Sequence, residues 1–187
     1  HSVKGCKMSL SDTPLAAAIV GCGRIASLFD NDTKRKHIST HAGAYTRFPG
    51  TELVAVCDKD LDRVLDCQKA WDVGSSYTDL SRMLKSQKID ILSICTHNDT
   101  HEKILKEAVK EGVKAIFCEK PISYSVASAR RMVELCKEHD VILAVNHFRR
   151  WTGFFQELKS KLENGVIGKP AYITFYYMRG IANSGSH

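Results

Sequence analysis

Five short apolar runs alternate with amphipathic segments along the first 146 residues of the chain. The runs are almost continuously hydrophobic: Leu15–Val20, Glu52–Cys57, Ile89–Cys95, Val113–Cys118 and Val141–Asn146. A half-exposed strand would alternate apolar and polar residues, whereas a parallel strand covered on both faces is apolar throughout. The pattern therefore predicts five strands of a buried parallel sheet.

The segments between these runs carry apolar residues three and four positions apart, which is typical of helices that pack one face on a sheet. Residues suited to capping predict where four of these helices begin: Asp60, Thr78, Asn98, and either Ser123 or Ser125. A further helix is predicted between Trp151 and Gly165. Because strands and helices alternate, we expect an α/β fold with a doubly wound parallel sheet of the Rossmann type.

Composition excludes several classes of protein. The 187 residues are 43% hydrophobic and 26% charged, which is ordinary for globular proteins. No run approaches the roughly 20 apolar residues of a membrane span, and the first residues lack the apolar segment of a secretory signal. The net charge of +6 is spread along the chain and accompanies no nucleic-acid recognition motif. We expect a cytoplasmic protein that binds neither membranes nor nucleic acid.

The seven cysteines form no CxxC pair and no metal-ligand spacing, so we expect no metal site. Their odd number and their position in apolar segments favour reduced, buried thiols. A redox or nucleophilic role for one of them stays open. His41 and several other histidines likewise have no ligand spacing, and we interpret them as surface or core residues.

A glycine-rich turn directly follows the first predicted strand. Gly21-Cys22-Gly23-Arg24-Ile25-Ala26 has the GxGxxA pattern that holds a dinucleotide pyrophosphate between a strand and a helix. Gly21 permits the tight turn, and Gly23 lets the pyrophosphate approach the backbone. We expect a helix after the turn, with N–H groups around Arg24 and Ile25 binding the anion. The motif is short and can also be a plain turn.

Asp58 ends the second predicted strand, where a carboxylate would accept hydrogen bonds from the adenosine ribose. It would also repel a 2′-phosphate, which favours NAD over NADP, although Lys59 beside it could meet such a phosphate. Asp58 follows Gly21 by more than the usual roughly twenty residues. The excess is an apparent insertion in the first crossover, from Leu28 to Gly50.

Glu119-Lys120-Pro121 follows the fourth predicted strand, at the edge where open α/β sheets bind their ligands. An ammonium group there can hold and polarise the oxygen of a carbinol as hydride leaves, so Lys120 is the leading catalytic candidate. An ordinary lysine titrates near pH ~10.4. Proton relay near neutrality would therefore require burial and nearby positive charge to lower the pKa of Lys120.

Four segments together carry a resemblance to a known family: Ala18–Ile25, Leu53–Asp58, Cys95–His101 and Cys118–Pro121. In order and spacing, the chain resembles the glucose–fructose oxidoreductase / inositol dehydrogenase (Gfo/Idh/MocA) family over roughly residues 15 to 187. The resemblance implies NAD-dependent hydride transfer, with Lys120 as the catalytic lysine and Glu119 at the nicotinamide ribose. In the family, the bond before the proline that corresponds to Pro121 is often cis.

The resemblance also implies residues around the nicotinamide and the substrate. Thr96, Asn98 and His101 match the family loop that lines the nicotinamide half of the site, although Asn98 and His101 can equally begin a helix. Arg150 resembles an arginine at the edge between cofactor and substrate. His187 matches a histidine that serves as general base, four positions after an acidic residue. The chain has Asn183 at that acidic position, which leaves its substrate class open.

After residue 147 the pattern changes, and the aromatic and β-branched run Ala171–Met178 predicts one strand of a second sheet. We expect an N-terminal extension (1–13), a dinucleotide-binding domain (14–147) and the beginning of a truncated α+β substrate domain (148–187). The missing part would supply the sheet through which a full-length protein forms a homo-oligomer. Residues 1–187 alone are therefore expected to bind cofactor without catalysis.

Three functions are compatible with these features. The leading hypothesis is an NAD-dependent oxidoreductase that acts on a secondary alcohol of a sugar, polyol or nucleotide sugar. The second is an NAD-dependent glycoside hydrolase or epimerase, in which oxidation is transient and no NADH accumulates. The third is a non-enzymatic NAD-binding regulatory module, which would need the glycines but not Lys120. Fold alone does not choose among substrates.

Overall fold

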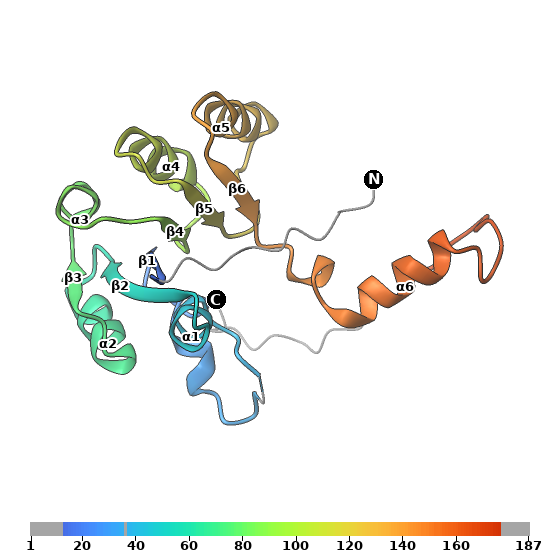
Figure 1. Ribbon diagram of the computed structural model, residues 1–187, viewed down its shortest axis with the longest axis horizontal. Helices are drawn as coiled ribbons and strands as arrows, with labels where there is room; N and C mark the ends of the chain where they lie inside the picture. Colours follow the sequence, from blue (N-terminus) through green and yellow to red (C-terminus); the bar gives the residue numbers. More distant parts are fainter. Residues whose placement is uncertain (1–12, 36, 177–187) are drawn as a thin grey trace. The chain divides into compact units, whose positions relative to one another are not determined.

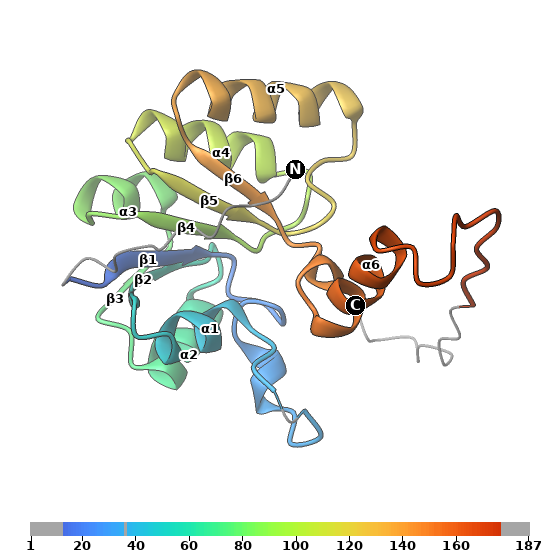
Figure 2. The same ribbon diagram turned by 45° about the vertical axis from the view of Figure 1, so that its right-hand side comes forward.

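The computed structural model describes residues 13–35 and 37–176. The chain divides into two compact units, one that ends at Asn146 and one that begins at His147. The first unit is a six-stranded parallel sheet in the order β3-β2-β1-β4-β5-β6. Helices α1 and α2 cover one face of the sheet, and α3, α4 and α5 cover the other (Figure 1 and Figure 2). The predicted doubly wound α/β fold is confirmed.

The five predicted strands are present, with ends that differ from the prediction by at most two residues. The strands are β1 (Leu15–Val20), β2 (Thr51–Cys57), β3 (Ser75–Tyr77), β4 (Ile91–Ile94), β5 (Ala115–Cys118) and β6 (Ile142–Val145). Only β3 had no counterpart in the prediction. It is three residues long, contains two serines, and pairs along one side with β2, so it has no apolar run to reveal it.

The helices are α1 (His41–Arg47), α2 (Leu61–Trp71), α3 (Leu80–Ser86), α4 (His101–Lys110), α5 (Val126–Glu138) and, in the second unit, α6 (Gly153–Glu163). Asp60 caps α2 and Ser125 caps α5, as predicted. Two predicted starts are wrong. Asp79, not Thr78, accepts the N–H of Arg82 at the start of α3, and Asn98 lies in a turn closed by Thr100 before α4.

No α-helix directly follows the glycine-rich turn, contrary to the prediction. Residues 24–27 form a turn, in which Ser27 N–H donates to the Gly23 carbonyl at 3.0 Å, and the short 3₁₀ helix η1 (Leu28–Asn31) follows. The first regular helix of this crossover is α1, within the insertion. Thr40 caps it by accepting the N–H of Gly43 at 3.0 Å, and the Asp30 carboxylate in turn accepts the Thr40 hydroxyl at 2.6 Å.

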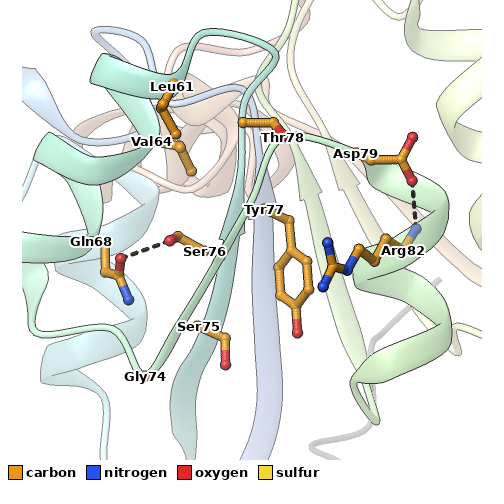
Figure 3. Close-up of a pocket in the computed structure, with 10 residues that line it drawn as sticks. All are labelled: Leu61, Val64, Gln68, Gly74, Ser75, Ser76, Tyr77, Thr78, Asp79 and Arg82. Carbon is orange, nitrogen blue, oxygen red and sulfur yellow. Dashed lines mark hydrogen bonds between the residues drawn. The ribbon is translucent and has the colours of Figure 1, made fainter.

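A cavity of about 340 Å³ opens between α2, β3 and α3 (Figure 3). Most of the residues that line it are polar. On one side Ser76 donates to Gln68 at 2.6 Å, and on the other Asp79 accepts the N–H of Arg82 at the start of α3. The cavity adjoins the second strand, since Asp58 N–H donates to the Tyr77 carbonyl at 3.1 Å. Of the site residues predicted from the sequence, none that falls within the described ranges lines it.

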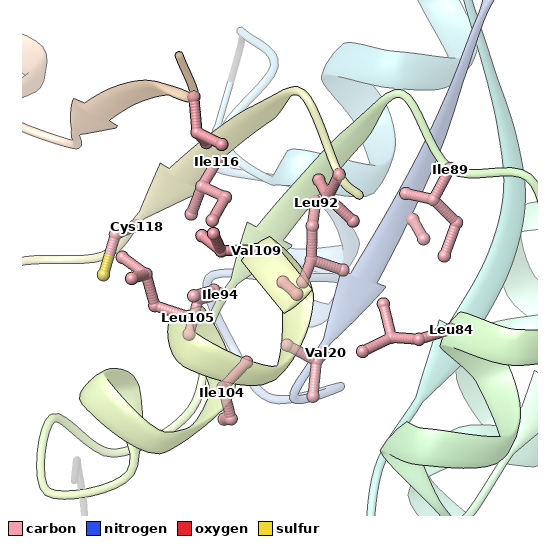
Figure 4. Packing of buried hydrophobic residues seen from close by; sticks show 14 of the residues in the cluster. Val20, Leu84, Ile89, Leu92, Ile94, Ile104, Leu105, Val109, Ile116 and Cys118 are labelled. Atoms are coloured by element: carbon pink, nitrogen blue, oxygen red, sulfur yellow. The ribbon is translucent and has the colours of Figure 1, made fainter. Parts of the chain in front are cut away.

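Two apolar cores hold the sheet between its helices. The larger core lies under α3, α4 and α5 and includes Leu92, Ile94, Leu105 and Ile116 (Figure 4). The smaller core lies under α1 and α2 and includes Ile19, Ala42, Val56 and Val64. Because both faces of the central strands are covered, the carboxyl ends of β1, β4 and β5 are held at one edge of the sheet.

The second unit contains the 3₁₀ helix η2 (Phe148–Arg150) and α6. Residues 171–176 form no strand, so the predicted strand Ala171–Met178 is wrong for the residues that the structure describes. A strand needs a neighbouring strand for its backbone hydrogen bonds, and the described residues of this unit offer none. Asn183 and His187 lie outside the described residues. No helix within the described ranges is long and apolar enough to cross a membrane.

Candidate active site

The glycine-rich turn lies against the end of β4. Gly21 has φ +91°, and a Cβ atom there would lie 2.8 Å from the backbone of Cys95 and Thr96. Only glycine fits such a position, because the conformation is strained for other residues and the neighbouring backbone cannot move aside. At Gly23 a Cβ atom would meet nothing within 4 Å. The turn is therefore packed tightly beneath Gly21 and open beside Gly23, where a pyrophosphate was predicted to approach.

The carboxylate of Asp58 fixes this turn. Its Oδ2 atom accepts the N–H of Cys22 at 2.7 Å, and its Oδ1 atom accepts the N–H of Asp60 at 3.0 Å. The next amides, those of Gly23, Arg24 and Ile25, donate to no acceptor within residues 13–35 and 37–176. Asp58 thus orients a turn whose N–H groups are available to an anion, and its oxygens retain acceptor positions for a ribose.

Glu119 is buried at the end of β5. Its Oε1 atom accepts His41 Nε2–H at 3.0 Å and Asn146 Nδ2–H at 2.5 Å, and its Oε2 atom accepts the backbone N–H of Lys120 at 3.3 Å. Burial alone would raise the pKa of Glu119, but the hydrogen bonds from His41 and Asn146 outweigh it and lower the pKa. The carboxylate is therefore ionised and accepts a hydrogen bond from the backbone of Lys120, the catalytic candidate. One acceptor position is left on Oε2.

The lowered pKa of Glu119 predicts an acid-dependent loss of stability. A carboxyl group with a lower pKa in the folded chain than in the unfolded chain stabilises the fold fully above its unfolded pKa. This contribution is lost as the pH falls through the folded pKa. Urea unfolding at several pH values should show the wild-type chain losing its advantage over Glu119→Gln between pH ~5 and ~2. A difference in unfolding free energy that does not change with pH would contradict this.

Lys120 follows directly, and the Lys120–Pro121 peptide bond is cis. The lysine side chain is exposed. The burial of Lys120 that was expected from the sequence is therefore not supplied by the described residues. The described residues instead fix where the turn that contains Lys120 lies. The Glu119 N–H donates to the Ile94 carbonyl at 2.9 Å, which holds this turn at the end of β4, next to the glycine-rich turn.

The loop after β4 presents Thr96 and Asn98, both partly exposed, at the same edge of the sheet. His101 is different, because it is 1% exposed. Its Nε2 atom lies 3.1 Å from the Thr96 carbonyl, and its Nδ1 atom lies 3.2 Å from both the Ile122 carbonyl and Cys118 Sγ. The imidazole ring joins the loops after β4 and β5. The structure thus gives His101 a role in holding these loops together, and its expected contact with a cofactor stays a prediction.

His41 was interpreted from the sequence as a surface or core residue, and its place in the site was not predicted. His41 is the first residue of α1 and is 4% exposed. One ring nitrogen binds Glu119, the other lies 2.8 Å from Ser93 Oγ, and the ring packs against Phe117. No spacing in the sequence signals these contacts, because His41 lies within the insertion and its partners lie on other strands.

The predicted substrate residues are not brought to this edge within the first unit. Arg150 belongs to the second unit, where it is exposed in η2 and its carbonyl accepts the side-chain amide of Gln156. Asn183 and His187, predicted as substrate contact and general base, lie outside the described residues. Their roles remain predictions.

All six cysteines within the described ranges are free, and all but Cys95 are buried. The predicted burial of the thiols is confirmed for the five cysteines other than Cys95. Burial raises the pKa of Cys57 and of Cys118 to about 12 each, and it also raises that of Cys95. A thiol with such a pKa carries little thiolate at neutral pH, which disfavours a nucleophilic role for these three residues.

Comparison with known proteins places this site in context. The profile of the oxidoreductase family with an NAD-binding Rossmann fold (GFO_IDH_MocA) matches residues 15–147. D-apiose dehydrogenase of Paraburkholderia graminis is 31% identical over 153 residues, which are 82% of this chain and 37% of that protein. Myo-inositol 2-dehydrogenase of Thermotoga maritima is 31% identical over 152 residues, 81% of this chain and 42% of that protein.

Among solved structures, an oxidoreductase from Agrobacterium radiobacter in complex with NAD⁺, L-tartaric acid and magnesium has a TM-score of 0.72 to this chain. It is 28% identical and covers 84% of this chain, which in turn covers 42% of it. The chain spans about two fifths of the length of the curated relatives it matches.

Proposed function

The chain belongs to the oxidoreductase family with an NAD-binding Rossmann fold, and we propose that it binds NAD and transfers a hydride between the nicotinamide and a secondary alcohol of a sugar, polyol or nucleotide sugar, which becomes the corresponding carbonyl compound when it is oxidised. The proposal rests on one observation: the glycine-rich turn and the Glu119-Lys120-Pro121 turn lie at the same edge of the sheet. Gly21 lies against the backbone of Cys95 and Thr96, and Glu119 is tied to Ile94 of the same strand end.

The residues at this edge fit a dinucleotide. The free amides of Gly23, Arg24 and Ile25 suit its pyrophosphate, and the space beside Gly23 is open. Asp58 is proposed for the adenosine ribose. Glu119 is proposed for the nicotinamide ribose, with Thr96 and Asn98 beside it. Bound NAD would supply the hydride acceptor, and the remaining chemistry falls to side chains of this chain.

Lys120 is proposed as the catalytic residue. Its ammonium group would hold the oxygen of the reacting carbinol and stabilise the negative charge that develops there, as the hydride passes to the nicotinamide and the hydroxyl proton passes to the predicted general base, His187. Glu119 fixes the backbone of Lys120 through Oε2, so the lysine begins from a defined position. The named relatives support an alcohol substrate, because they are dehydrogenases of D-apiose and myo-inositol.

The remaining roles are also proposals. Residues 14–147 would form the dinucleotide-binding domain, and residues 148–187 would begin a substrate domain in which Arg150, Asn183 and His187 meet the substrate. Turnover and assembly into a homo-oligomer would require the regions of the relatives that this chain does not match. The free thiols support a reducing compartment such as the cytoplasm.

We predict that the chain binds NAD more tightly than NADP, by about tenfold or more, because the Asp58 carboxylate would repel the 2′-phosphate. Titration of both cofactors at fixed salt measures the preference. Asp58→Asn is a suitable variant, because the amide oxygen can still accept the N–H of Cys22 while the charge is removed. This variant should lose most of the preference, and Lys59→Met should enlarge it.

Equal or tighter NADP binding by the wild-type chain would contradict the role of Asp58 and would point to Lys59 as a phosphate contact. The overall proposal is tested by substrate screening with the complete protein. Accumulation of NADH with sugar or polyol substrates supports net oxidation. Turnover without NADH would instead support the hydrolase or epimerase hypothesis.

A further inference from the structure

A buried series of hydrogen bonds runs from the insertion (Leu28 to Gly50) to the turn that contains Lys120. Tyr45 Oη lies 2.7 Å from Ser93 Oγ, Ser93 Oγ lies 2.8 Å from His41 Nδ1, and His41 Nε2 lies 3.0 Å from Glu119 Oε1. None of the four residues is more than 9% exposed. This series of hydrogen bonds joins α1, β4 and the end of β5, three elements that are far apart in the sequence.

The direction of each bond follows from the chemistry of its partners. An ionised Glu119 can only accept, so His41 donates from Nε2–H. In the neutral imidazole ring, the Nδ1 atom then carries no proton and accepts the hydroxyl proton of Ser93. Ser93 Oγ then accepts from Tyr45. Burial, opposed by the hydrogen bond with Ser93, raises the pKa of Tyr45 to about 12, so its hydroxyl keeps the proton that it donates. These directions give His41 the Nε2–H tautomer.

The backbone of His41 reaches the other half of the site. Its N–H donates to the Ile25 carbonyl at 3.1 Å, and the N–H of Ala42 donates to the Ala26 carbonyl at 2.9 Å. Helix α1 therefore begins on the glycine-rich turn, while its first side chain holds Glu119. One residue joins the part of the site proposed for the pyrophosphate to the part proposed for the nicotinamide.

We propose that His41 is a positioning residue that sets the Glu119–Lys120 turn relative to the glycine-rich turn, so that one dinucleotide meets both. The inference rests on the proposed function. Loss of the Nε2–H donor would leave a buried carboxylate oxygen with one partner fewer, and Glu119 would reorient together with the Lys120 backbone that it holds. The pyrophosphate half would be unaffected, because the backbone bond of His41 does not depend on its side chain.

Two matched variants separate this role from simple packing. In His41→Gln, the amide nitrogen reaches about as far as imidazole Nε2 and can still donate to Glu119. In His41→Asn, the shorter amide reaches only as far as Nδ1, so the donor to Glu119 is lost. The probes are NAD and ADP, since ADP contains the adenosine and pyrophosphate groups but cannot reach Glu119.

His41→Asn should weaken NAD binding to the 187-residue chain by about tenfold, the factor expected for a lost hydrogen bond to a charged group. ADP affinity should stay within about twofold of wild type, and His41→Gln should recover most of the NAD affinity. Equal losses for NAD and ADP, or equal behaviour of the two variants, would overturn the inference, because either result means that His41 only supports the fold.

Nitrogen-15 NMR of the imidazole rings gives a readout that does not involve the cofactor, with the His41 signals assigned by their loss in His41→Asn. We expect a protonated Nε2 atom and an unprotonated Nδ1 atom whose resonance shifts in Ser93→Ala. The opposite tautomer would overturn the inference. A wild-type chain that binds neither NAD nor NADP would contradict the proposed function, whereas NAD binding that His41→Asn leaves unchanged would overturn the inference alone.

Discussion

Replacing Lys120 with alanine in the complete protein is expected to lower turnover by about a hundredfold or more, while NAD affinity stays within a few-fold. The lysine is assigned to the oxygen at which charge develops in the transition state, so its loss should appear in both kcat and kcat/KM. The cofactor keeps its other proposed contacts, because the glycine-rich turn, Asp58 and Glu119 do not depend on the Lys120 side chain.

Steady-state kinetics together with NAD titration measure this effect, and Lys120→Arg is the matched control. Arginine keeps the positive charge but presents it in a wider, planar group that does not lose its proton near neutrality. We expect it to recover only part of the electrostatic contribution to turnover, because the oxygen of the carbinol would meet a different geometry. Near-normal turnover in Lys120→Ala would mean that the lysine only lies near the site, and the proposed mechanism would be wrong.

The second large effect is expected for Gly21→Ala, which should destabilise the fold and remove NAD binding. The Cβ atom would lie 2.8 Å from backbone atoms of Cys95 and Thr96, and φ +91° is unfavourable for alanine. Backbone strain of this kind costs roughly 1–3 kcal/mol, and the clash with the backbone that directly follows β4 adds to it. Urea unfolding should therefore show a loss of at least about 2 kcal/mol in the free energy of unfolding.

Gly23→Ala is the matched control for this variant, since a Cβ atom there meets nothing within 4 Å. We expect it to unfold like the wild-type chain and yet to bind NAD more weakly, because the added methyl group occupies the space proposed for the pyrophosphate. If Gly21→Ala were as stable as the wild-type chain, the packing of the turn against β4 would be described incorrectly. Unchanged NAD affinity in Gly23→Ala would argue against the pyrophosphate site.

Much of the fold was determined by short-range features of the sequence. The five apolar strands were predictable because parallel strands covered on both faces have no polar positions, so each appears as one unbroken run. Asp60 and Ser125 were recognisable as helix caps, because a cap bonds to amides only two or three residues further on. The same holds for the glycine-rich turn, whose residues are consecutive.

Features without a local pattern were missed or misplaced. The edge strand β3 is too short and polar to form an apolar run, and the helix expected directly after Ala26 is replaced by η1 and the later α1. For α3, Thr78 and Asp79 are both capping residues, and only the path of the backbone decides which side chain reaches the free amides. These errors concern one short edge strand, the first crossover and individual helix caps, and none of them affects the five strands that were predicted.

The composition of the site itself was decided by the tertiary structure. Sequence patterns identified Gly21, Asp58 and Lys120, because each follows the end of a predicted strand and such ends meet at one edge of a parallel sheet. They did not identify His41, which bonds to Ser93 and Glu119 at sequence separations of 52 and 78 residues. Periodicity reports only how a residue relates to its near neighbours, whereas a buried hydrogen bond between distant residues exists only after the strand order has brought its partners together.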